Sequence, residues 1–247
     1  PIAVAVDAIS FLISALFLGL IRTPEPAPKP PDEQQNIFVQ VGEGLGLVSG
    51  SALLRAIAGG MSTLHLFNGV LEAVFVLYLT RELGIGPGLL GLIFASGSVG
   101  FLVGALSPGW VTRQFGLGSG IIGGLFLVGL SDLLIPLVGG SVVMMVRILV
   151  LMAAQFFFGL GLTIFNIGQV SVRQAVTPDH LQGRMNATLS FIAAGSVPLG
   201  GLLGGGLGEM IGLRTTLVLA AMGEMLAVLW LILSPIRSLR EQPALME

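Results

Sequence analysis

The stretch IAGGMSTLHLFNGVLEAVFVLYL, residues 57–79, decides the fold class of this chain. Its one formally charged side chain is Glu72, and most of the other residues are apolar or small. The hydrocarbon core of a bilayer is about 30 Å thick, and a helix of about 20 apolar residues crosses it. The stretch is therefore predicted to be a membrane-spanning helix.

Further stretches of similar length and composition occur on both sides of it, which predicts an all-α membrane protein with seven transmembrane helices. The predicted spans are residues 2–21, 57–79, 88–111, 117–138, 142–166, 187–208 and 213–233. Most of the connections between them are short, so neighbouring helices are expected to pack antiparallel.

The composition of the chain excludes several classes of protein. Of 247 residues, 54% are hydrophobic and 10% are charged, which is too little polar surface for a protein surrounded by water. The lipid bilayer is the expected partner. A net charge of −2 gives no basic face for nucleic acid. No Ser-His-Asp arrangement, metal-ligand cluster or G-x-x-x-x-G-K loop supports an enzyme or a bound cofactor.

The order of polar and apolar segments predicts four parts. Residues 1–21 form one span, and residues 22–56 hold a Pro-rich linker, TPEPAPKPPDEQQ, followed by an interfacial helix. Residues 57–235 form a bundle of six spans, and residues 236–247 are a tail. Placing the linker in the cytoplasm puts eight of the 11 basic residues on that side. The carboxyl terminus is then cytoplasmic.

Several sequence motifs resemble one transporter family. The stretch VRQAVTPDHLQGRMNA, residues 172–187, resembles the loop between the tenth and eleventh helices in the macrolide-efflux and siderophore-exporter (enterobactin-exporter-like) branch of the major facilitator superfamily. Three further matches follow the same order: DAISFLISA from Asp7, EGL from Glu43 and PLGGLLGG from Pro198. The resemblance implies helices six to twelve of a twelve-helix fold, with helices one to five of the same protein absent. The start at Pro1 fits that expectation of a fragment.

One motif departs from the family. The loop between the eighth and ninth helices often resembles G-x-x-x-D-R-x-G-R-R there, whereas this chain reads GWVTRQFGLG over residues 109–118, with Arg113 in the acidic position. The gating contacts attributed to that motif are not carried over to this chain.

A polar stripe lies within the span 57–79. His65, Asn68 and Glu72 are spaced i, i+3 and i+7, which places them on one face of a helix. A carboxyl inside a membrane costs about 2.5–3.5 kcal/mol, so Glu72 is expected to load and release a proton on the transport pathway. The resemblance implies that this helix lines the pathway. A hydrogen bond from Glu72 to a neighbouring helix is the alternative.

Other polar residues inside the predicted spans have less specific interpretations. Gln155 and Asn166 share one face of their helix and are expected either to contact substrate or to bond a neighbouring helix. Asp7, Asp132 and Glu224 are expected to make structural pairs, and the sequence assigns them no partners.

Two further sets of residues have predicted roles. Arg173, Asp179 and Arg184 lie in the long polar stretch of residues 169–186, where the resemblance implies a cytoplasmic gate closed by salt bridges; a solvated loop without a special task is the alternative. Close helix packing is predicted where small residues repeat every fourth position, after a helix-kinking proline. The packing set is Pro198, Gly200, Gly204 and Gly208.

The resemblance implies transport by alternating access in the plasma (inner) membrane. The expected activity is efflux of a small lipophilic compound, drug-like or siderophore-like, by an antiporter with H⁺ as the coupling ion. Two alternatives stay open. One is an incomplete half-transporter with no independent activity, and the other is a seven-helix receptor or sensor. A retinal-based pump is disfavoured because the last helix has no lysine.

Overall fold

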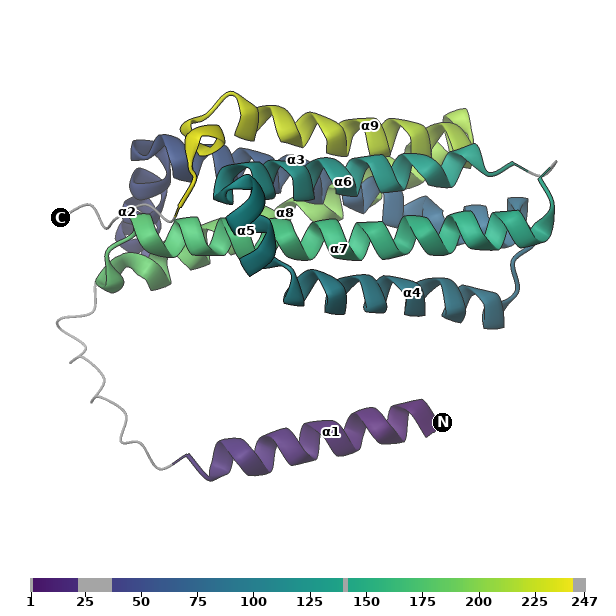
Figure 1. The fold of residues 1–247 in the computed structure, drawn as a ribbon, viewed down its shortest axis with the longest axis horizontal. Coiled ribbons are helices and arrows are strands. Elements are labelled where there is room, and N and C mark those ends of the chain that lie inside the picture. The colour runs from purple at the N-terminus through teal and green to yellow at the C-terminus, as the bar shows by residue number, and fades with distance from the viewer. Residues whose placement is uncertain (1, 22–36, 140–141, 242–247) are drawn as a thin grey trace. The chain divides into compact units, whose positions relative to one another are not determined.

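The computed structural model describes residues 2–21, 37–139 and 142–241, and within these ranges all regular structure is helical (Figure 1). The prediction of an all-α membrane protein is confirmed. Six helices in the described ranges are long and apolar enough to cross a bilayer. They are Ala52–Glu82, Pro87–Leu106, Leu117–Leu137, Met144–Val176, Asp179–Ile211 and Leu213–Ile232.

The chain divides into two compact units, one reaching to Ile37 and the other beginning at Phe38. The first contains α1 (Ile2–Gly19), which covers the first predicted span. Its apolar part with described side chains, Asp7–Gly19, is shorter than a membrane span. The predicted Pro-rich linker falls mostly at residues 22–36, outside the described ranges.

The second unit is the six-span bundle together with short helices at its edges (Figure 1). The sequence predicted an interfacial helix before the bundle, and a helix, α2, is present there. The elements are α2 (Ile37–Gly50), α3 (Ala52–Leu77) with a π-helical turn (Tyr78–Glu82), α4 (Pro87–Leu106), α5 (Pro108–Phe115), α6 (Leu117–Leu137), α7 (Met144–Val176), α8 (Asp179–Ile211), α9 (Leu213–Ile232) and a 3₁₀ turn (Pro235–Ser238).

The helix boundaries follow local chemistry. Ser51 caps α3, because its hydroxyl oxygen accepts a hydrogen bond from the backbone N–H of Leu54 at 3.4 Å. Pro87 occupies the first turn of α4, where its missing N–H costs nothing. Gly116 and Gly212 have nearly identical backbone angles, with φ of 84° and 85°, and each directly precedes a helix. Only glycine adopts such a positive φ readily.

The packing repeats across the two halves of the bundle. α3 packs chiefly against α8 and α9, and α7 packs chiefly against α4 and α6. If α3, α4 and α6 are taken as one three-helix set and α7, α8 and α9 as the other, the first helix of each set contacts the second and third helices of the other set. Gly116 and Gly212 stand before the third helix of each set, so the two sets share a backbone feature as well as a packing pattern. This is the arrangement expected of internal structural repeats.

The polar stretch of residues 169–186, predicted to be a loop, is helical except at its centre. α7 continues to Val176 and α8 begins at Asp179, each with 33 residues. A helix of that length is about 50 Å long and extends beyond a hydrocarbon core of about 30 Å. Hydropathy detects only the part inside lipid, so the predicted span within α7 ended too early and the predicted span within α8 began too late. Apolar side chains of the extensions, among them Val176 and Met185, pack with Val48 of α2.

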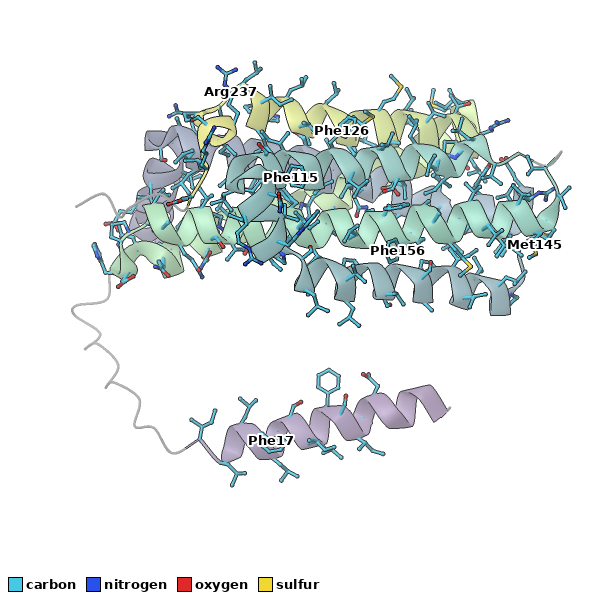
Figure 2. The ribbon with its side chains drawn as sticks, viewed as in Figure 1. Phe17, Phe115, Phe126, Met145, Phe156 and Arg237 are labelled. Atoms are coloured by element: carbon cyan, nitrogen blue, oxygen red, sulfur yellow. The ribbon has the colours of Figure 1, made fainter. Side chains whose placement is uncertain are left out.

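Much of the bundle surface is apolar. Phe126 on α6 and Met145 on α7, both labelled in Figure 2, have side chains that are 43% and 68% exposed. In water such a surface would cause aggregation, whereas in a bilayer it is the surface that lipid requires.

Candidate functional site

A polar layer separates two apolar clusters inside the bundle. One cluster contains Leu64 of α3, Val128 of α6 and Ala227 of α9, and the other contains Leu71, Ile135 and Ala220 of the same three helices. The residues at the level between the clusters are Asn68 of α3, Asp132 of α6 and Glu224 of α9.

Asp132 and Glu224 are the two acidic side chains of this layer, here called the carboxyl pair. They are 1% and 0% exposed. Their carboxyls lie within interaction range of each other, and the amide of Asn68 lies near Glu224. Among the described residues, no donor reaches Oδ2 of Asp132 or either carboxyl oxygen of Glu224 with full hydrogen-bonding geometry. The pair is therefore enclosed, and among the described residues the amide of Asn68 and the carboxyl of Glu72 are the polar side-chain groups that act on Glu224 besides Asp132.

The predicted pathway stripe lies on α3 beside this layer. Glu72 is exposed on the surface of the bundle, about one turn along from Asn68, and it interacts electrostatically with Glu224. His65 is half-buried, and its Nδ1 lies 2.8 Å from the carbonyl oxygen of Met61 in its own helix. The sequence assigned the special carboxyl to Glu72 and a plain structural role to the other two. The structure instead places the deepest burial at the carboxyl pair.

Gln155 and Asn166 lie half-buried on α7. The side chain of Gln155 lies against Gly97 of α4, where an added Cβ would be 3.4 Å from Oε1 of the glutamine. Within the described ranges, neither residue forms a hydrogen bond with the stripe on α3. Their predicted substrate contact stays a prediction.

The predicted gate residues belong to helix ends rather than to a loop. Arg173 is buried near the end of α7, where Nη1 donates to Oε1 of Gln169 at 3.0 Å and Nη2 donates to Oδ1 of Asn186. Arg184 of α8 forms an ion pair with Glu43 of α2. These contacts join α2, α7 and α8 at one end of the bundle.

Asp179, the third predicted gate residue, stands in the first turn of α8, and its Oδ1 accepts a hydrogen bond from Nε2 of Gln182 at 3.0 Å. This bond lies within a single helix. A gating role for any of the three residues stays a prediction.

The predicted packing glycines lie where α8 crosses α3. An added Cβ on Gly204 would lie 2.5 Å from the carbonyl oxygen of Val70, and one on Gly200 would clash with the backbone of Leu66. An added Cβ on Gly208 would lie 2.9 Å from Cγ1 of the Val74 side chain. Pro198 lies inside α8, which continues through it. The two helices therefore approach each other backbone to backbone.

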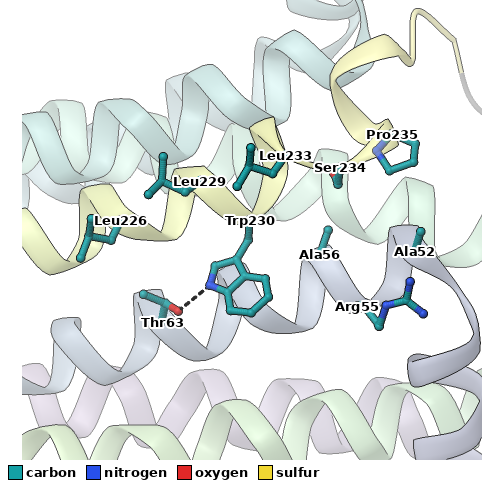
Figure 3. A pocket seen from close by; sticks show the side chains of 10 residues that line it. All are labelled: Ala52, Arg55, Ala56, Thr63, Leu226, Leu229, Trp230, Leu233, Ser234 and Pro235. Carbon is teal, nitrogen blue, oxygen red and sulfur yellow. Dashed lines mark hydrogen bonds between the residues drawn. The ribbon is translucent and has the colours of Figure 1, made fainter.

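A separate groove opens between α3 and α9, with a cavity volume of about 640 Å³ (Figure 3). Its lining is mostly apolar, with Arg55 at one end. The indole Nε1 of Trp230 donates to Oγ1 of Thr63 at 3.1 Å across it. None of the predicted pathway residues lines this groove.

The architecture and sequence together identify the family. A profile of the Major Facilitator Superfamily matches residues 57–246, which is the six-span bundle and the segment that follows it. The chain belongs to the Major Facilitator Superfamily. Members of this family are membrane transporters rather than enzymes. A comparison with curated proteins finds no match, so the efflux branch stays a prediction.

In this Major Facilitator Superfamily chain, the stretch that departs from the family motif, residues 109–118, forms most of α5, the following Gly116 and the start of α6. Arg113 lies in the last turn of α5, where its Nε donates to the carbonyl oxygen of Gly109 at 3.0 Å. The following Gly116 packs near Arg240, and the backbone N–H of Leu117 donates to the carbonyl oxygen of Arg240 at 3.1 Å. The segment after α9, predicted to be a tail, is therefore attached to the bundle at least as far as Arg240.

The pairing of Asp132 with Glu224 was missed in the sequence of this transporter. Each is the one acidic residue within its predicted span, and this is the sequence feature that could have marked both as unusual. Their contact depends on α6 and α9 being neighbours and on the rotation of both helices. Hydropathy and spacing within one helix report neither property.

Proposed function

We propose that this transporter exports a small lipophilic compound, drug-like or siderophore-like, by alternating access in exchange for protons. The observation that supports the proposal best is Glu72. It is an acidic side chain within a membrane-spanning helix, exposed on the bundle surface and within electrostatic range of Glu224. Intramembrane ionisable groups are costly and in general functional.

The chemistry of the α3 stripe suits proton exchange. In the proposed twelve-helix fold, the exposed side chain of Glu72 would line a central cavity, where water could bring a proton to it and take one away. Asn68 and His65 on the same face add polar groups that can keep such water in place. Gln155 and Asn166 of α7 would contribute hydrogen-bonding groups toward the substrate.

The proposal also includes the membrane, the orientation and the partner helices of the protein. The protein would lie in the plasma (inner) membrane with its carboxyl terminus in the cytoplasm and would work together with helices one to five of the same fold. Arg173, Asp179 and Arg184 would form contacts at the cytoplasmic end that change between inward-open and outward-open states. The coupling ion would be H⁺, with no other cofactor.

The proposal can be tested by measuring efflux from cells that carry the intact protein. Cells are loaded with ethidium, a fluorescent lipophilic cation, or with a catecholate siderophore, and efflux is followed with and without a protonophore. The protonophore is expected to stop protein-dependent efflux. Glu72→Gln, which cannot exchange a proton, is expected to reduce it at least about tenfold, equivalent to about 1.4 kcal/mol.

Glu209→Gln is the matched control, because Glu209 is an exposed acid on α8 that has no part in the stripe. It is expected to keep wild-type efflux. Efflux that is indifferent to the protonophore would contradict proton coupling. An unchanged rate and unchanged pH dependence in Glu72→Gln would remove this residue from the mechanism. Failure to move either compound would favour a different substrate class or a half-transporter without independent activity.

A further inference from the structure

The carboxyl pair has no evident role in a pathway centred on Glu72. Asp132 and Glu224 come from α6 and α9, and both lie inside the bundle between its two apolar clusters. Buried acids are rare because removing a carboxylate from water costs several kcal/mol unless it is compensated. Two of them side by side need a specific chemical explanation.

Hydrogen-bond chemistry limits what the pair can be. An ionised carboxylate accepts hydrogen bonds and has none to give, so two ionised carboxylates cannot bond each other. A proton on either one supplies the missing O–H donor. The oxygens of Glu224 and Oδ2 of Asp132 have no other donor with full geometry among the described residues. One proton between them would supply one hydrogen bond across the pair and remove one of two adjacent like charges.

Among the described residues, no cationic group acts on the pair in place of a proton. The groups that act on the pair from the packed helices are Asn68 and Glu72 of α3, one neutral and one acidic. Arg214 of α9 is directed elsewhere, since its Nε donates to the carbonyl oxygen of Pro136 at 2.7 Å. On α5, α7, α8 and the 3₁₀ turn, no described titratable group interacts with either carboxyl. The described residues also contain no group of three potential metal ligands.

We propose that Asp132 and Glu224 form an enclosed proton-binding site, in which one proton is shared between the two carboxyls and the amide of Asn68 orients Glu224. Its ligand is H⁺ alone. The site is distinct from Glu72, which is exposed and lies on α3. The proposal concerns the charge state of the pair and stands whether or not transport is coupled through Glu72.

The test is infrared spectroscopy of the intact protein in liposomes at neutral pH, where a protonated carboxylic acid and a carboxylate absorb at separate frequencies. Wild type is compared with Asp132→Asn/Glu224→Gln. We expect the double variant to lose the band of one protonated carboxylic acid per chain, a band that shifts when H₂O is replaced by D₂O. The matched control is Glu82→Gln/Glu209→Gln, which removes two exposed acids and should lose only carboxylate absorption.

A second measurement uses the wild-type sequence, so it does not depend on the variant folding. Protein is prepared with ¹³C in the side-chain carboxyls of either aspartate or glutamate. The protonated band that is absent from the double variant should move with one or both labels. Loss of carboxylate bands alone in the double variant, or no protonated band that responds to either label, would overturn the proposal. Failure of proton-coupled efflux would leave this spectroscopic result unaffected, so the two proposals can fail separately.

Discussion

The two contacts that α3 makes with its neighbours are built in opposite ways. Against α8 the backbones meet almost directly, with Gly69 on one side and Gly200 and Gly204 on the other. Against α9, side chains fill the space: the ring of Phe67 covers Gly223, and polar side chains reach across from both helices. The α3–α8 contact depends on glycines, which have no side chain to keep the backbones apart. The α3–α9 contact depends on side chains that fit each other in shape and in hydrogen bonding.

This difference predicts different responses to substitution. Lipid is as apolar as a leucine side chain, so adding apolar surface gives no driving force for association between helices in a membrane. The α3–α8 contact is held by close approach and should tolerate no added volume. The α3–α9 contact is held by particular pairs and should be sensitive to the loss of one partner.

The largest effect is expected from adding volume to the α3–α8 contact. Gly204→Leu places a side chain where even a Cβ would lie 2.5 Å from the carbonyl oxygen of Val70. Separating the helices would cost about 3 kcal/mol. We expect little folded protein in the membrane and a large fall in the midpoint of thermal unfolding in detergent.

Gly205→Leu is the matched control, since Gly205 is the next residue of the same helix and has no atom within 4 Å of an added Cβ. It should fold almost as well as wild type. Equal damage from both substitutions would show that α8 does not tolerate leucine at this depth for some other reason. Normal folding of Gly204→Leu would contradict the close contact itself.

A smaller effect is expected from breaking the carboxyl pair. Glu224→Leu leaves Asp132 buried with its partner gone, which should destabilise the bundle by about 2 kcal/mol. Asp132→Leu/Glu224→Leu removes both polar groups and should cost less than the sum of the two single substitutions. Thermal unfolding of all four proteins gives this coupling directly. Additive costs would mean that the two carboxyls do not interact.

The smallest effect is expected at the edge of the α3–α9 contact. Trp230→Phe keeps an aromatic ring over Gly59 but removes the indole N–H that donates to Thr63. A single hydrogen bond contributes about 1 kcal/mol, so a modest fall in unfolding midpoint is expected. Thr63→Val alone should cost a similar amount, and the double variant should cost little more than either. A fall in the unfolding midpoint of the double variant equal to the sum of the two single falls would indicate that Trp230 and Thr63 stabilise the bundle independently.

Much of the fold was readable from the sequence because it depends on local properties. Each of the six spans of the bundle corresponds to a long helix, although α7 and α8 are longer than their predicted spans. The repeat of Gly200, Gly204 and Gly208 pointed to one face of α8, and that face meets α3. A period of four residues is a property of one helix, so no knowledge of the partner was needed.

The candidate site was readable only in part. The spacing of His65, Asn68 and Glu72 correctly grouped them on one face of α3, but it could not tell which carboxyl is enclosed. Glu72 is exposed on this bundle, whereas Asp132 and Glu224 are buried. Burial depends on which helices surround a residue, and that information is spread over α3, α6 and α9.

The sequence by itself determined that this protein is a set of membrane helices, because a backbone in lipid must satisfy its hydrogen bonds internally and a helix does so within one segment. It also determined which residues are small enough for close approach. Only the tertiary structure decided how the helices are paired and rotated, and therefore that two acids from separate spans face each other. Helix pairing in lipid depends on the fit between whole surfaces, and no single segment of sequence contains both surfaces of a contact.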